Sequence, residues 1–158
     1  MWPLAIQFDD ANHPMKASVD ALLQLTPGVS TLQDMYNSVG YPRKRKDFSD
    51  SVALLYPSLW VKSPHVVILD GNSGKVMVVS IENVSKPIFS LSHLTQVYGE
   101  PTLAYSDARD YYLFPNAGIA AIVYNGETIY IQLLPKNITV DEYHKHQGYW
   151  QQTFSFVP

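Results

Sequence analysis

The pattern of apolar and polar positions predicts two short amphipathic helices that are built alike. In each, a hydroxyl residue able to cap free backbone N–H groups precedes an apolar stripe at helical spacing, and Gly and Pro then end the helix. The two stripes are Leu32, Met35, Tyr36 and Val39 in the first helix, and Leu91, Leu94, Thr95 and Tyr98 in the second. Because helices of about ten residues are unstable alone, both are expected to pack on a sheet.

Runs with strand character follow each helix. The predicted strands are 51–56, 63–69 and 75–81 after the first helix, and 110–114, 118–124 and 127–134 after the second. Asn125-Gly126 predicts a tight hairpin, since both central residues of that turn need positive φ. The last strand alternates, so one set of side chains is predicted to face the helix and the other to face away. The inward set is Ile129, Ile131 and Leu133, and the outward set is Thr128, Tyr130 and Gln132.

The helix and strands recur in the same order, which predicts a duplicated unit. Residues 31–42 match 90–101, residues 54–57 match 112–115, and residues 67–71 match 122–126, at offsets of 59, 58 and 55. The predicted fold is therefore α+β. It consists of two repeated units, each a helix with a three-stranded antiparallel sheet, forming one six-stranded sheet with helices on one face.

This interpretation divides the chain into four parts. Residues 1–18 are a lead-in segment, 19–85 the first repeat, 86–135 the second repeat, and 136–158 a C-terminal tail that packs on the sheet or in a groove. Within the tail, a short helix is expected around 140–146, and Trp150 is expected to seal an edge or the mouth of the groove.

Composition excludes several classes of function. The chain has 158 residues, 46% of them hydrophobic, and a formal charge of −3, which gives no general attraction to nucleic acid. It has no cysteine, and therefore no disulfide, thiolate zinc site or Cys nucleophile. The run 43–46 (Arg-Lys-Arg-Lys) is interpreted as a solvated loop, with a patch that contacts an acidic partner as the alternative.

The usual signals for export and for membrane spanning are missing. No apolar run reaches the roughly 20 residues that span a bilayer. Residues 1–4 lack the charged start and long apolar stretch of a signal peptide. Either the protein is cytoplasmic, or a leader or upstream region precedes this sequence.

Catalytic patterns are also missing. No nucleophile elbow and no phosphate-binding Gly-rich loop occurs. His144 and His146, with Asp141 and Glu142 nearby, are candidate metal ligands, but on a helix the two rings diverge by about 200°. Asp107 and Asp110, on either side of Arg109, are interpreted as surface charges with local pairing. We therefore predict no catalytic residue, no metal and no cofactor, and expect the protein not to be an enzyme.

One stretch resembles a known family. Residues 25–34 (LTPGVSTLQD), with Val39-Gly40-Tyr41-Pro42, resemble the start of the SmpA/OmlA (BamE-like) domain of outer-membrane lipoproteins. Two copies in tandem resemble the arrangement of the beta-lactamase inhibitory proteins, and the resemblance covers roughly 22–134. It implies a binding role in the bacterial cell envelope or the secreted space. The chain departs from the pattern because it has neither a lipidated Cys nor disulfides, and because the second unit lacks the Pro-Gly pair.

Two functions are predicted from these observations. The first is a non-catalytic protein-interaction module that binds a protein of unknown identity, not a nucleic acid, through an open aromatic-rich sheet face. The predicted binding residues are Tyr130, Gln132, Thr128, Tyr111 and Trp60, with Trp60 equally well placed in the core or at the rim. The alternative is a small-ligand or sensor domain that uses the groove between the repeats. Membrane proximity would require a leader that this sequence does not contain.

Overall fold

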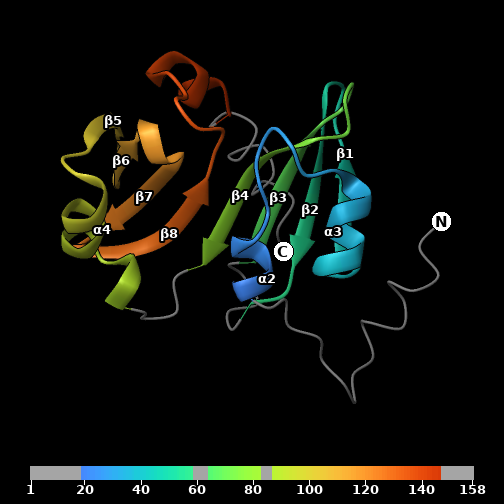
Figure 1. Cartoon of the computed structure of the whole chain (residues 1–158), viewed down its shortest axis with the longest axis horizontal. Helices are drawn as coiled ribbons and strands as arrows, with labels where there is room; N and C mark the ends of the chain where they lie inside the picture. The colour runs from blue at the N-terminus through green and yellow to red at the C-terminus, as the bar shows by residue number, and fades with distance from the viewer. Residues whose placement is uncertain (1–18, 59–63, 83–86, 147–158) are drawn as a thin grey trace.

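A computed structural model of the chain describes residues 19–58, 64–82 and 87–146 (Figure 1). The helices are α2 (Val19–Leu23), α3 (Leu32–Ser38) and α4 (Leu91–Tyr98), with short 3-10 turns at Pro87–Phe89 and Pro115–Ala117 and a further helical segment at 140–146. The strands are β1 (Lys44–Asp47), β2 (Ser51–Tyr56), β3 (His65–Asp70), β4 (Val76–Glu82), β5 (Thr102–Ser106), β6 (Asp110–Phe114), β7 (Ile119–Tyr124) and β8 (Glu127–Leu133).

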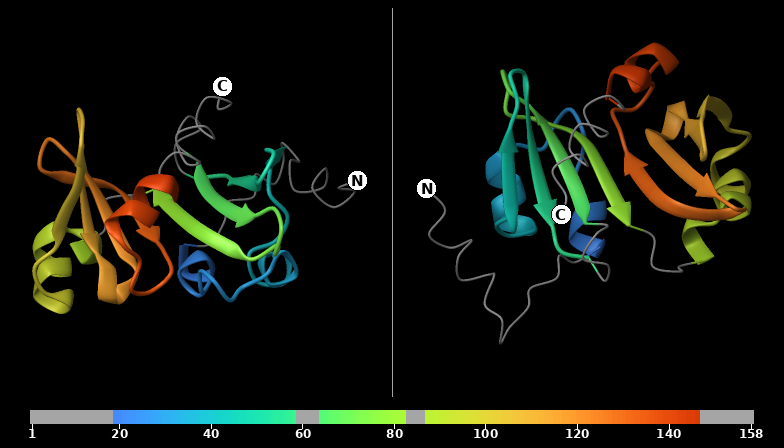
Figure 2. Two further views of the ribbon diagram at one scale, coloured as in Figure 1. Left: turned by 90° about the horizontal axis from the view of Figure 1, so that it is seen from above. Right: turned by 180° about the vertical axis from the view of Figure 1, so that it is seen from behind.

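All eight strands form one continuous antiparallel sheet in the order β1-β2-β3-β4-β8-β7-β6-β5. The strands that precede residue 83 and those that follow it meet at β4 and β8, where pairing runs from Val79 with Leu133 to Glu82 with Tyr130. Figure 2 shows β4 and β8 side by side at this junction. The α+β class is confirmed, whereas the predicted sheet of six strands is too small.

The six predicted strands are present, and the two additional strands lie at the edges of the sheet. β1 contains most of the basic run, so the expectation of a loop there is wrong. Its four residues carry too little apolar character to predict a strand, yet they pair with β2 from Lys44 to Asp47. Lysine on an edge strand opposes pairing with a further strand. β5 is also short, and nothing in its sequence separates it from the loop that follows α4.

Local capping explains where the two predicted helices begin. At α3, the Asp34 N–H donates to Thr31 Oγ1 (3.2 Å) and the Thr31 N–H donates to Asp34 Oδ2 (2.9 Å), a reciprocal capping box. At α4, the His93 N–H donates to Ser90 Oγ (3.2 Å). Gly40 and Gly99 follow the two helices with positive φ of 99° and 87°, a conformation that favours glycine.

Helices pack on both faces of the sheet. Met35 of α3 and Leu94 of α4 are buried in two cores that include Ile81 and Ile131 respectively. Those two isoleucines are paired across β4 and β8 and therefore share a face. On the opposite face, Tyr143 of segment 140–146 is buried in a third core. The helices α3 and α4 therefore share one face, whereas segment 140–146 packs on the opposite face, so helices are not confined to one face of the sheet.

Candidate protein-binding surface

The residues predicted to form an open binding face are buried. The exposed fraction is 0% for Tyr111, 1% for Gln132, 6% for Tyr130 and 8% for Thr128. Trp60 and Trp150 lie outside the described residues. The predicted alternation of β8 is correct for Ile131 and Gln132, but the face that bears Gln132 is not open.

That face is covered because the chain after β8 folds back over it. Leu134, Ile138 and Tyr143 belong to the same core as Tyr111 and Tyr130. The Tyr143 hydroxyl donates a 2.7 Å hydrogen bond to Oε1 of Gln132, so a polar side chain of the sheet is satisfied by the covering segment. The segment after β8 thus covers Tyr111, Tyr130 and Gln132 of the predicted face.

Two polar contacts position the covering helix. Thr139 and Glu142 form a capping box, in which the Glu142 N–H donates to Thr139 Oγ1 (3.1 Å) and the Thr139 N–H donates to Glu142 Oε1 (3.3 Å). One turn later, His144 Nε2 lies 2.7 Å from the carbonyl oxygen of Ala104 and must donate to it, because a carbonyl only accepts. In the sequence, the spacing of Thr139 and Glu142 (T-x-x-E) is the signal that indicates the start of this helix.

The Tyr143–Gln132 bond gives a first testable prediction. Tyr143→Phe removes the hydroxyl and leaves the buried Gln132 oxygen without its donor, so we expect the free energy of unfolding to fall by about 1–3 kcal/mol. Gln132→Leu combined with Tyr143→Phe removes both polar partners and is expected to lose less than the two single losses added together. Urea denaturation of the four proteins measures this coupling. Strictly additive losses would contradict a direct bond.

Two titratable side chains lie near the junction of β4 with β8: His65, which is buried, and Glu82, which is partly buried. His65 Nδ1 accepts the Glu82 backbone N–H at 3.0 Å, so the proton of the neutral ring is on Nε2. Burial lowers the pKa of His65 to about 4. Burial raises the pKa of the Glu82 carboxyl to about 7, and the Tyr130 hydrogen bond partly opposes this. Because the lone pair at Nδ1 is already used, His65 is poorly suited to act as a general base.

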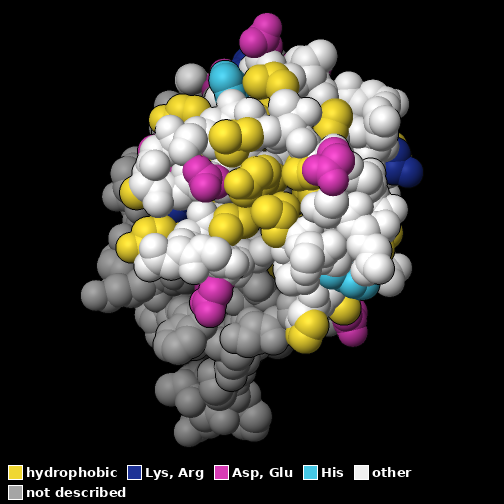
Figure 3. Space-filling view, turned by 90° about the vertical axis from the view of Figure 1, so that its left-hand side faces the viewer, with side chains coloured by type: hydrophobic (Ala, Val, Ile, Leu, Met, Phe, Trp, Pro, Cys, Tyr) yellow, Lys and Arg dark blue, Asp and Glu magenta, His cyan; other side chains and the backbone are white. Residues whose placement is uncertain are grey.

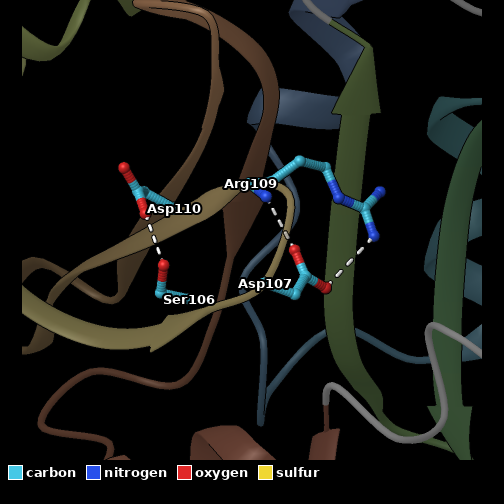
Figure 4. Close-up of polar contacts among 4 residues, drawn as sticks. All are labelled: Ser106, Asp107, Arg109 and Asp110. Carbon is cyan, nitrogen blue, oxygen red and sulfur yellow. Dashed lines mark hydrogen bonds and ion pairs between the residues drawn. The ribbon is translucent and has the colours of Figure 1, made fainter.

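The charged residues proposed for local pairing do pair locally. Arg109 Nη2 lies 3.6 Å from Asp107 Oδ2, the Arg109 N–H donates to Asp107 Oδ1 (2.7 Å), and Ser106 Oγ donates to Asp110 Oδ1 (2.7 Å) (Figure 4). All four groups shape the turn between β5 and β6. No cluster of three metal-ligating side chains occurs within the parts of the chain that the structure describes. In those same parts, no helix combines the length and apolar character needed to cross a bilayer.

Among the described residues, exposed large apolar side chains are concentrated after residue 83. Of the large hydrophobic side chains exposed among the described residues, only Val29 precedes residue 83. The others are Ile88, Val97, Tyr98, Leu103, Tyr105 and Tyr124. We define the α4–β5 surface as Val97, Tyr98 and Leu103. Figure 3 shows an apolar patch on this side of the molecule, with acidic side chains around it.

The geometry of the α4–β5 surface follows from its two elements. Leu103 of β5 is paired with Tyr112 of β6 and therefore lies on the helix-bearing face of the sheet. The Tyr98 ring packs at 6.1 Å from the ring of Phe114, which belongs to the core under α4. Tyr98 thus joins the exposed surface to the core. In the sequence, Tyr98 and Leu103 lie on either side of the segment 99–102 that ends the helix, but no periodicity distinguishes them from residues of the core.

Comparison of the chain with family models, with curated proteins and with solved structures finds no match.

Proposed function

We propose that the protein is a non-catalytic interaction module that binds a protein partner through the α4–β5 surface. The observation that carries the proposal is that Val97 and Tyr98 of α4 and Leu103 of β5 are all exposed, and that an apolar patch lies on the side of the molecule that bears these two elements (Figure 3). Contiguous exposed apolar patches with a polar rim are typical of protein-binding sites on soluble domains. Tyrosine suits such a site because its rigid ring buries a large area at low entropic cost.

A duplicated origin fits this proposal. The matched sequence segments fall on equivalent elements, with α3 matching α4, β2 matching β6, and β3 matching β7. Within this scheme the two units have diverged at their outer edges, where β1 carries Lys44, Arg45 and Lys46 while β5 carries no charge. A binding function confined to the second unit would account for that difference. The resemblance to envelope domains further suggests that the partner is a protein of the cell envelope or the secreted space.

Site-specific photo-crosslinking in the producing cells tests the proposal. A benzophenone amino acid placed at Leu103 or at Val97 is expected to crosslink the same protein, identified by mass spectrometry. The matched control is the same group at Val29, which is 67% exposed, compared with 54% for Leu103, but lies in the turn before α3. Leu103→Asp should weaken recovery of that protein by at least about tenfold, because a charge would be buried in the interface.

The control variant Val29→Asp should leave recovery unchanged. Both aspartate variants should retain the wild-type unfolding midpoint within error, since each replaced side chain is more than half exposed. If no protein is crosslinked from either position on the α4–β5 surface, or if Val29 crosslinks the same protein equally well, the proposed surface is wrong.

A further inference from the structure

We infer that the partner adds an extended segment to the outer edge of β5, as a ninth strand, and that this segment carries alternating apolar and basic residues. This inference rests on the proposed function and specifies how the partner binds. β5 ends the sheet in the order of strands, so its outer side has no neighbouring strand among the described residues. An exposed edge of this kind accepts a peptide strand through main-chain hydrogen bonds.

One backbone carbonyl of β5 accepts a hydrogen bond from a side chain outside the sheet. Leu103 pairs with Tyr112 and Tyr105 with Tyr111, so Ala104 between them has no partner in register on β6. The Ala104 carbonyl oxygen instead accepts a hydrogen bond from His144 Nε2 at 2.7 Å. The Ala104 carbonyl is therefore already used by segment 140–146, and an added strand would pair with the other main-chain groups of β5.

Side chains on both faces of β5 would contact an added strand. Leu103 lies on the face that bears α4, the helix that ends in the exposed Tyr98. Tyr105 lies on the opposite face, where its ring makes an edge contact with Tyr111 (5.2 Å) and another with His144 (6.0 Å). Because side chains of a strand alternate between faces, an added segment would place apolar residues against Leu103 on one side and near Tyr105 on the other.

The charges around β5 favour a basic partner. From Val97 to Phe114, the charged residues are Glu100, Asp107 and Asp110 against Arg109 alone. The opposite edge strand, β1, is basic and uses charge to oppose strand addition. β5 lacks that protection, since Thr102–Ser106 contains no charged residue. Lysine or arginine next to the apolar positions of the partner would complement the acidic surroundings and speed association.

A defined peptide tests the mode of binding. The probe is a fluorescent seven-residue peptide of alternating lysine and valine, titrated with the full chain at low salt and followed by fluorescence anisotropy. Two control peptides have the same valines, one with glutamate in place of lysine and the other with every backbone nitrogen methylated. We expect both to bind at least about tenfold more weakly, through loss of charge attraction and of main-chain donors respectively.

Amide hydrogen exchange locates the bound peptide. The backbone N–H groups of 102–106 are expected to exchange at least about tenfold more slowly when the peptide is bound, because opening of the edge is suppressed. Leu103→Asp removes the apolar contact and should weaken peptide binding, whereas Val29→Asp should not. Both variants fold if their unfolding midpoints match that of the wild type.

Three results would overturn the inference. The first is equal binding of the methylated peptide, with no added protection at 102–106, which would mean docking on a face. The second is failure of the lysine peptide to bind. The third is a concentration-dependent dimer, seen by light scattering and abolished by Leu103→Asp, which would make a second copy of the chain the occupant. In the first two cases, crosslinking from Leu103 and Val97 still reports independently on the proposed function.

Discussion

Gly118→Ala is expected to lower the free energy of unfolding by more than about 3 kcal/mol, or to prevent folding. Gly118 has a positive φ of 66°, and a Cβ built there would overlap the backbone oxygen of Leu134 and lie 3.2 Å from the Lys136 nitrogen. Both neighbours are main-chain atoms, which cannot move without disturbing the turn. The Leu134 N–H donates to the Gly118 carbonyl at 2.8 Å, so the new methyl group would push apart the two segments that this bond joins.

The matched control is Gly126→Ala. Gly126 also has a positive φ, 79°, but a Cβ there would meet no atom within 4 Å. The free energy of unfolding is expected to fall by only about 1–2 kcal/mol, the cost of placing a residue with a Cβ in the left-handed conformation. Urea denaturation monitored by tryptophan fluorescence and by circular dichroism compares the two variants. Equal losses would show that the contact with Leu134 is relieved cheaply. A larger loss for Gly118→Ala would identify this close approach as the point where the covering segment 134–146 is anchored.

The pH dependence of stability should be nearly flat from pH 4.5 to 6.5 as far as His65 and Glu82 are concerned, because their contributions oppose each other. The pKa of His65 is lowered from 6.5 to about 4, so its contribution is present above pH 6.5 and is lost as the pH falls through 4. The pKa of Glu82 is raised from 4.5 to about 7, so its contribution is present below pH 4.5 and is lost as the pH rises through 7. Between pH 4.5 and 6.5, the folded state binds one proton at Glu82 and the unfolded state binds one at His65. The two states therefore bind equal numbers of protons, and stability does not change with pH.

Single substitutions should separate the contributions of His65 and Glu82 to the pH dependence of the free energy of unfolding. In Glu82→Gln only His65 titrates, and stability is expected to fall by up to about 3 kcal/mol as the pH drops from 6.5 to 4. In His65→Asn, whose amide oxygen can still accept the Glu82 N–H, only Glu82 titrates. Stability should then fall as the pH rises from 4.5 to 7, by about 1–2 kcal/mol once partial exposure of the carboxyl is allowed for.

Measuring each variant against the wild type removes the contributions of other groups, including His146, whose pKa burial also lowers. Urea denaturation at intervals of about half a pH unit from pH 4 to 7.5 covers both windows. If Glu82→Gln and the wild type differ by a constant amount at every pH, the raised pKa of Glu82 is wrong. If His65→Asn and the wild type do so, the lowered pKa of His65 is wrong.

Local elements were predictable because their signals lie in adjacent residues. The hydroxyl cap at Thr31, the Gly after each helix and the positive φ of both Asn125 (49°) and Gly126 (79°) all match the structure. The two edge strands were missed for a related reason. β1 and β5 hold four and five residues and form because a longer neighbour offers a ladder, which no local pattern of their own reports.

By itself, the sequence determined the positions of α3 and α4, six of the strands, the hairpin turn and the opposite orientation of Ile131 and Gln132 in β8, but not the register shift that puts Ile129 against the same core as Tyr130. It also determined that Tyr130 and Gln132 share a face. Only the tertiary structure decided whether that face meets solvent, because alternation groups side chains by side and says nothing about a segment that returns from elsewhere in the chain. Ile138, Val140 and Tyr143 pack against it, three apolar residues in a largely polar tail, too few to form a clear period. The proposed binding surface is therefore formed by Val97, Tyr98 and Leu103 instead, which no later segment among the described residues covers.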